Sequence, residues 1–300
     1  MRKIRGSGVD RRRFLAGMGG AGLAAVAGPA LLGGCSRVGT GNTMDRIQSQ
    51  GYVNVGFANE APYGYIDLET GELTGESPEL ARAIFAEFGI DDLRGVPVQF
   101  DGLIPGLVGG QFDMVSAGMA ITPERCAEVD FTNPEYLSRT AFLVPEGNPE
   151  GIEQFHAFVD NPDLTLGVMN ATIEQNTAET IGIPGSQVQT APDTSSAFEL
   201  LETGRIDAVA LTAISLRWML DVRGGPYQVT EPFFPVIDGE EEISGGGYAI
   251  RQEDDELREA FNEKLEEFKD SGRLLEILKP FGFSAGELPG DLTAAELCEG

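Results

Sequence analysis

The sequence predicts an α/β protein in two lobes. Strand-like and helix-like segments alternate along the chain, a pattern typical of mainly parallel sheets covered by helices. The alternation occurs twice, and the chain is longer than one ordinary hydrophobic core requires. Pro- and Gly-rich segments at 138–151 and 238–247 separate the halves. We therefore expect two crossings between lobes, with lobe one at 45–144 plus 245–300 and lobe two at 145–244.

The N-terminal segment is predicted to be an export signal. Its basic residues precede an Ala- and Gly-rich apolar run that ends at Cys35, and the Gly and Pro content of this run disfavours a permanent membrane helix. DRRRFLAG (10–17) resembles a twin-arginine signal and LLGGC (31–35) resembles a lipobox. This implies a signal over 1–34, lipid attachment at Cys35, a tether over 35–44 and an extracytoplasmic, membrane-anchored protein. An ordinary secretory signal with a chance Cys is the alternative.

Lobe one is expected to begin with a β-rich strand over 52–58. In the helix predicted over 77–89, Ser77 is placed to cap the N-terminus and Gly89 to end it. A second helix is predicted over 122–129, with Thr122 as its cap and Pro123 at its first position. The remaining elements of this lobe are a buried strand over 112–118, a returning strand over 245–251 and an amphipathic helix over 254–272.

Lobe two repeats the alternation of strands and helices. A short apolar run predicts a strand over 164–169, and a polar, helix-favouring segment follows it over 170–182. The segment 194–204 is expected to be helical, with Gly204 at its end, and it leads into a strand over 205–211.

Composition excludes several classes of function. The chain has 21 Lys and Arg against 48 Asp and Glu, and its dense basic cluster, Arg11–Arg13, lies in the predicted signal, so we expect no nucleic-acid partner. One histidine, His156, and three cysteines are too few for a zinc site or for histidine-based catalysis. We expect no metal, no cofactor and no enzymatic activity, and we expect His156, in a polar stretch of lobe two, to be an exposed bystander.

Four segments in order resemble the solute-binding proteins of polar amino-acid ABC importers: NVGFANEAPYGY (54–65), LIPGLVGGQFDMVSAGMAITPER (103–125), GRIDAVALT (204–212) and LREAFNEKLEEFKDSGRLLEIL (257–278). Within that family the chain is most similar to ectoine/hydroxyectoine-binding proteins, through FANEAPYGY (57–65), ESPELAR (76–82), AGMAITPERC (117–126) and AAELC (294–298). The resemblance implies a periplasmic-binding-protein-like type II fold with the ligand cleft between the lobes. It also implies a monomer that delivers a small zwitterionic solute to a membrane ABC permease.

Arg125 is the predicted partner of the ligand carboxylate. It lies in the first turn of a helix, where free backbone N–H groups and a guanidinium together favour an anion. A surface ion pair with a neighbouring glutamate is the alternative. By resemblance, Gly118 and Thr122 assist Arg125, and the turn at Ala171 and Thr172 of lobe two closes onto the same carboxylate. Many relatives have Gly at the position of Ala171.

The cationic end of the ligand is predicted from Thr212. Amino-acid binders of the family carry there an Asp that neutralises the α-ammonium, and an unpaired buried charge is costly. Thr212 therefore favours a cation spread over a ring, such as ectoine. By resemblance, Tyr63 and Phe100 form an aromatic cage, and Glu60 and Glu174 accept hydrogen bonds from the ring N–H groups. Ordinary packing of the aromatic rings and solvated surface carboxylates are the alternatives.

Ala120 departs from the family pattern, because the relatives carry an aromatic residue there. We expect either another aromatic residue to compensate, with Tyr65, Phe233 and Phe234 as candidates, or a wider pocket for a different cyclic or methylated solute. A polar amino-acid binder is the alternative function. A cyclodehydratase-like enzyme on the same fold is another, with Glu60 or Glu174 as general acid.

Cys126 and Cys298 remain once Cys35 carries lipid. In an oxidising compartment an even pair favours a disulfide, which would join the C-terminal tail to lobe one.

Overall fold

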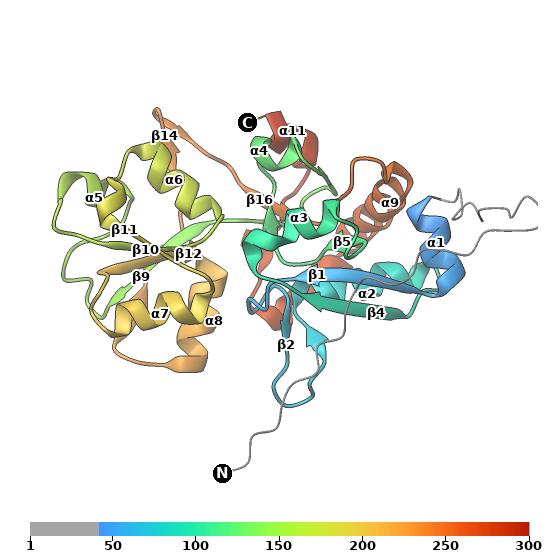
Figure 1. The fold of residues 1–300 in the computed structure, drawn as a ribbon, viewed down its shortest axis with the longest axis horizontal. Coiled ribbons are helices and arrows are strands. Elements are labelled where there is room, and N and C mark those ends of the chain that lie inside the picture. The colour runs from blue at the N-terminus through green and yellow to red at the C-terminus, as the bar shows by residue number, and fades with distance from the viewer. Residues whose placement is uncertain (1–41, 300) are drawn as a thin grey trace, which may run out of the picture. The chain divides into compact units, whose positions relative to one another are not determined.

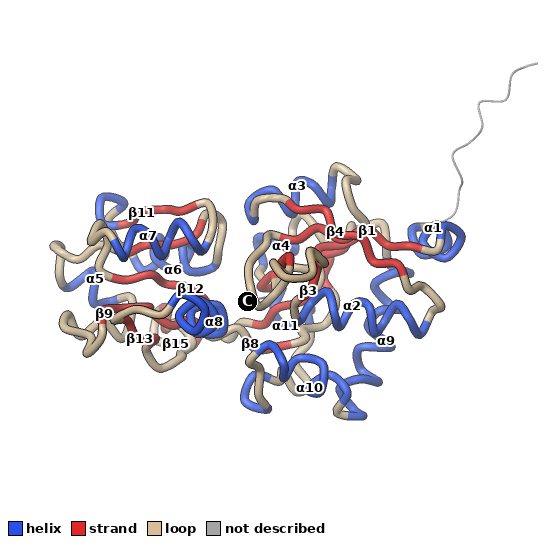
Figure 2. Tube along the Cα trace, turned by 90° about the horizontal axis from the view of Figure 1, so that it is seen from below, coloured by secondary structure: helices blue, strands red, loops and turns tan. Residues whose placement is uncertain are grey.

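The computed structural model describes residues 42–299, so the predicted signal, the lipidation site Cys35 and most of the tether lie outside the described residues. These residues form two α/β lobes (Figure 1). The strands of each lobe form their own group, bordered by helices (Figure 2). Within 42–299, no helix combines the length and the apolar character needed to cross a membrane.

Lobe one contains a parallel sheet in the order β4–β1–β5, formed by β4 (Asp92–Pro97), β1 (Tyr52–Phe57) and β5 (Met114–Val115). Helices α2 (Glu76–Glu87) and α9 (Asp255–Ser271) pack together and bury apolar stripes in the same core. On α9 the buried residues are those that the helical periodicity predicted: Leu257, Phe261, Leu265 and Phe268.

Helix α2 begins differently from the prediction. Its N-cap is Gly75, whose φ of +125° suits glycine, and not Ser77. A Cβ at Gly75 would lie 2.3 Å from the Tyr63 carbonyl oxygen, so the chain is close-packed there. Ser77 instead turns inward, where its Oγ lies 2.6 Å from Glu76 Oε1 and 3.0 Å from Glu135 Oε1.

A second sheet of lobe one, β6–β16–β8, lies beside the crossings. Its central strand, β16 (Gly245–Gly247), is antiparallel to both β6 (Met119–Ala120) and β8 (Tyr136–Leu137). A Cβ at Gly246 would lie 2.2 Å from the Tyr136 ring, so any larger residue there would have to displace this buried ring.

Lobe two is built on a five-stranded sheet in the order β11–β10–β12–β9–β13. Strands β11 (Val188–Ala191), β10 (Leu166–Met169) and β12 (Ala208–Thr212) are parallel, whereas β9 (Thr140–Pro145) and β13 (Tyr227–Val229) are antiparallel additions.

Strand β9 corrects the predicted lobe boundary at 144. Turn-forming residues suggested a break near Pro145, yet β9 pairs with β12 and β13, and Phe142 packs on Phe155 in the lobe-two core. The first crossing therefore lies before Thr140. The second crossing precedes β16.

The remaining helices are α1 (Thr43–Gln50), α3 (Leu103–Val108), α4 (Pro123–Cys126), α5 (His156–Asp160), α6 (Ile173–Ile181), α7 (Thr194–Glu202), α8 (Ala213–Arg223), α10 (Arg273–Leu278) and α11 (Ala294–Glu299). The remaining strands are β2 (Tyr65–Ile66), β3 (Leu73–Thr74), β7 (Asp130–Phe131), β14 (Val236–Ile237), β15 (Glu240–Glu241) and β17 (Ala249–Ile250).

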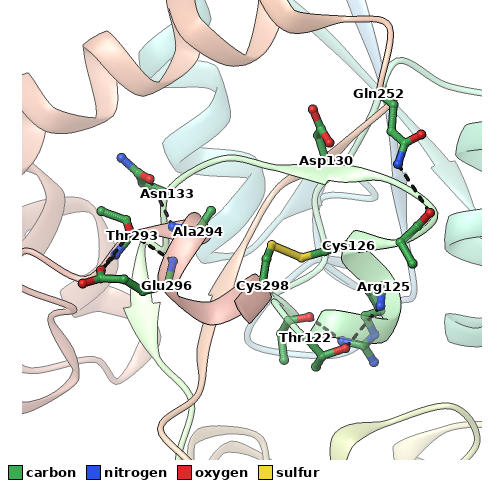
Figure 3. Close-up of a disulfide and its surroundings, with 12 residues drawn as sticks. Thr122, Arg125, Cys126, Asp130, Asn133, Gln252, Thr293, Ala294, Glu296 and Cys298 are labelled. Atoms are coloured by element: carbon green, nitrogen blue, oxygen red, sulfur yellow. Dashed lines mark hydrogen bonds between the residues drawn. A yellow bond between two sulfur atoms is a disulfide. The ribbon is translucent and has the colours of Figure 1, made fainter. Parts of the chain in front are cut away.

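A disulfide joins Cys126 of α4 to Cys298 of α11, with the two Cα atoms 5.7 Å apart (Figure 3). The backbone N–H of Ala294 also donates to the Asn133 side chain, at 3.2 Å. The C-terminal tail is therefore held on lobe one at two places. His156 is exposed at the start of α5.

Candidate functional site

Residues from both lobes line one cavity, and eight of the nine predicted ligand-binding residues are among them. Lobe one provides Glu60, Tyr63, Phe100, Gly118 and Arg125, and lobe two provides Thr172, Glu174 and Thr212. Ala120, Ser138, Ile173 and Leu211 complete the lining. The cavity volume is about 20 Å³, room for about one water molecule. A solute therefore enters only when the lobes separate or side chains move.

Thr122 is the predicted site residue that does not line the cavity. Its side chain caps α4 instead, accepting a hydrogen bond from the backbone N–H of Arg125 at 3.4 Å (Figure 3). Its role in this structure is to position Arg125 and not to contact the cavity.

Arg125 spans the cavity from lobe one to lobe two. Its Nη1 donates to the Ala120 carbonyl at 2.6 Å and its Nη2 donates to the Ala171 carbonyl at 2.8 Å. Burial lowers the pKa of Arg125 to about 10, while the nearby charge of Glu174 opposes that change, so the guanidinium is charged at neutral pH. Exchange of the Ala171 carbonyl for a carboxylate would strengthen this interaction, because ion-paired hydrogen bonds exceed neutral ones.

Ala171 occupies the turn where many relatives have Gly. Its φ is +61°, in the left-handed region that glycine adopts most readily. The turn therefore keeps this backbone conformation despite the Cβ.

Two buried carboxylates face the same cavity. Glu60 Oε1 accepts a hydrogen bond from Ser215 Oγ at 2.6 Å, and Glu174 Oε1 accepts one from Thr140 Oγ1 at 3.3 Å. Burial raises the pKa of Glu60 to about 7; the Ser215 bond opposes this and the charge of Glu174 adds to it. Burial also raises the pKa of Glu174. Two carboxylates against one guanidinium give the cavity an excess of acceptors for N–H groups, which suits a ligand with a cationic part.

The two predicted cage aromatics are buried at the cavity wall. Tyr63 stacks on Tyr136 with ring centroids 5.2 Å apart, and its hydroxyl donates to Thr212 Oγ1 at 2.9 Å. The Phe100 ring centroid lies 5.4 Å from Arg125 Cζ. Phe100 thus contacts the guanidinium itself, in a geometry compatible with a cation–π interaction.

None of the three candidates to replace the aromatic missing at Ala120 lines the cavity. Tyr65 packs against Trp218, Phe233 packs against Phe142, and Phe234 lies beneath Arg139. The compensation expected from these rings is therefore absent, and Ala120 leaves one wall of the cavity without an aromatic face.

Three hydrogen bonds connect the lobes across the cavity: Tyr63 to Thr212, Ser215 to Glu60, and Arg125 to Ala171. Ser215 was missed by sequence reasoning. Its distance from Thr212 in the sequence could have indicated it. Thr212 is the N-cap of α8, so Ser215, three positions later, lies in the first turn of that helix beside it.

Comparison with known proteins identifies chains that are similar to this one. Residues 53–284 match the bacterial extracellular solute-binding proteins, family 3. A probable amino-acid ABC transporter periplasmic-binding protein, y4tE of Sinorhizobium fredii, is 33% identical over 263 residues, covering 85% of this chain and 86% of that protein. A probable histidine-binding protein of Campylobacter jejuni is 30% identical, covering 74% and 81%. The crystal structure of EhuB in complex with hydroxyectoine superposes with a TM-score of 0.77 at 31% identity, covering 85% of this chain and 97% of that one.

Proposed function

This chain belongs to the bacterial extracellular solute-binding proteins of family 3, and we propose that its solute is a ring-shaped zwitterion, ectoine or hydroxyectoine. The family membership makes it the extracytoplasmic solute-binding component of an ABC importer, for an amino acid or a related solute. Its relatives are binding proteins of importers and not enzymes, which argues against the cyclodehydratase-like alternative.

One observation carries the choice of solute: the cavity combines Arg125 with two buried carboxylates and has a threonine at position 212. Arg125 matches a carboxylate. Glu60 and Glu174 can each accept a hydrogen bond from a different N–H group of a delocalised cation. Thr212 is already hydrogen-bonded to Tyr63 and has no charge with which to pair an α-ammonium. The likeness to EhuB in its hydroxyectoine complex supports the same assignment.

A polar amino acid such as histidine is the second candidate. The similarity to a probable histidine-binding protein favours it, and the same two carboxylates could accept hydrogen bonds from an ammonium group. An α-ammonium group favours a carboxylate at position 212, whereas a ring zwitterion does not, so a substitution at this position distinguishes the two candidates.

Isothermal titration of residues 36–300 with ectoine, hydroxyectoine, histidine and arginine tests the proposal. We expect saturable binding of the ring solutes at micromolar Kd, about 8 kcal/mol, and no heat from the amino acids. In Thr212→Asp, the new carboxylate should add affinity for histidine and weaken ring-solute binding. Binding of histidine alone by the unaltered protein would overturn the ring-zwitterion assignment.

We also propose that the protein is exported by a twin-arginine-type signal, lipidated at Cys35 and active as a monomer beside its membrane permease. Mass spectrometry of the detergent-extracted protein should find a lipid-modified N-terminal Cys35, and Cys35→Ala should release the protein from membranes. Recovery of the protein in the soluble fraction without detergent, with Cys35 present and unmodified, would contradict lipid anchoring.

A further inference from the structure

Two serines stand opposite each other where the chain crosses between the lobes. Ser138 follows β8 on the first crossing, and Ser244 precedes β16 on the second. The backbone N–H of Ser138 donates to the Ser244 carbonyl at 2.8 Å, which extends the antiparallel pairing of Leu137 with Gly245 by one residue. Both serines are buried, with 2% and 9% of their surface exposed, and neither Oγ has a hydrogen-bond partner.

The two side chains lie on the same face of the ladder, because directly opposite residues in an antiparallel pair share a face. They border different spaces, however. Ser138 lines the solute cavity, whereas Ser244 lines the neighbouring groove between α4, α6 and the β14–β15 hairpin. Ser138 therefore borders the proposed solute site, and Ser244 provides a matched comparison outside it.

The other polar side chains that line the cavity already form hydrogen bonds. Arg125 bonds two carbonyls, Glu60 and Glu174 accept from hydroxyls, and Tyr63 donates to Thr212. The charged groups have the chemistry to match the charged parts of a zwitterion. Ser138 adds a neutral hydroxyl that can both donate and accept, and a buried hydroxyl without a partner is unfavourable.

We propose that Ser138 Oγ hydrogen-bonds a hydroxyl substituent of the solute and so gives the site a preference for the hydroxylated ring zwitterion over its unhydroxylated form. The inference rests on the proposed function. Backbone pairing with Ser244 holds Ser138 on the crossing itself, so the position of its hydroxyl depends on the ladder and not on contacts made by lobe closure.

Titration of the unaltered protein, Ser138→Ala and Ser244→Ala with hydroxyectoine and with ectoine tests the proposal. The unaltered protein should bind hydroxyectoine more tightly than ectoine. Ser138→Ala should weaken hydroxyectoine binding about three- to tenfold, the loss expected for one neutral hydrogen bond, and leave ectoine binding unchanged. Ser244→Ala should keep the original ratio of the two affinities.

Thermal unfolding without solute separates this role from a structural one. Ser138→Ala removes an unpartnered buried hydroxyl, so its midpoint should equal or exceed that of the unaltered protein. An equal loss of affinity for both solutes, with a lower midpoint, would overturn the inference. An unchanged affinity ratio in Ser138→Ala would also overturn it and leave the ectoine assignment standing. Binding of histidine and of neither ring solute would overturn both.

Discussion

Binding of a cationic solute should release a proton from Glu60. This carboxyl is buried in the cavity, and burial raises its pKa from 4.5 to about 7. The difference between these values corresponds to about 3 kcal/mol in favour of the protonated form. A cation placed beside Glu60 favours the ionised form instead, so it must displace the proton whenever the pH lies below about 7.

The direction of the pH effect follows from this competition. Above about pH 7 Glu60 is ionised before the solute arrives, and affinity should be constant. As the pH falls below 7, affinity should fall by up to about tenfold per pH unit, with up to about one proton released for each solute bound. The effect should end once the pH falls below the pKa that Glu60 has with the solute bound, because the carboxyl is then protonated in both states.

Titration at pH 6 in two buffers with different ionisation enthalpies measures the released protons, because the observed heat includes their uptake by the buffer. Glu60→Gln should reduce the difference in heat between the two buffers and flatten the pH dependence of the affinity, leaving only the contribution of Glu174, whose pKa burial also raises. Glu69→Gln, on an exposed loop, should behave like the unaltered protein. Equal heats in the two buffers for the unaltered protein, with constant affinity from pH 5 to 8, would refute the reasoning.

Three further predictions concern other residues. Arg125→Ala should weaken solute binding about 100-fold in titration, because it leaves the carboxylate of the solute unpaired. Arg94→Ala breaks an exposed pair with Asp92 and should leave the affinity unchanged. Equal losses of affinity in the two variants would contradict the assignment of the site. Cys298→Ser removes a disulfide between residues 172 positions apart in the sequence, and it should lower the free energy of unfolding by about 2–5 kcal/mol in denaturant. An unchanged denaturation midpoint would count against a structural role for the disulfide. Burial raises the pKa of Glu135 from 4.5 to about 8, so the folded protein favours the protonated carboxyl and its stability should decline as the pH rises from 4.5 to 8. In thermal melts Glu135→Gln should flatten this pH profile. A parallel decline in the variant would assign the loss of stability to other groups.

The parts of the site that depend on local signals could be predicted from the sequence. Thr122 and Pro123 start a short helix, and this fixes Arg125 on its first turn. The strand predicted over 205–211 forms at Ala208–Thr212 and so brings Thr212 to its end, whereas helix α8, which follows directly, was not predicted. In each case a cap or a strand end lies within a few residues of the functional side chain.

The parts that depend on pairing between distant segments could not be predicted. The sequence indicated Ser77 as a helix cap, because nothing nearby shows that Glu135 would approach it from 58 residues away. Ser215 acquires its role only when the lobes bring Glu60 to it. Turn-forming residues near Pro145 likewise favoured a lobe boundary there. The pairing of β9 with β12 places this segment in lobe two, but it joins strands that are distant in the sequence and leaves no local signal.

The position of β16 has a consequence for how the chain acquires its structure during synthesis. This strand lies between β6 and β8, so lobe one cannot close its second sheet until residues 245–247 have left the ribosome. All five strands of the large lobe-two sheet lie between Thr140 and Val229 and are complete by then. Lobe two can therefore fold first as a unit, while the earlier-synthesised lobe one waits for the last part of the chain.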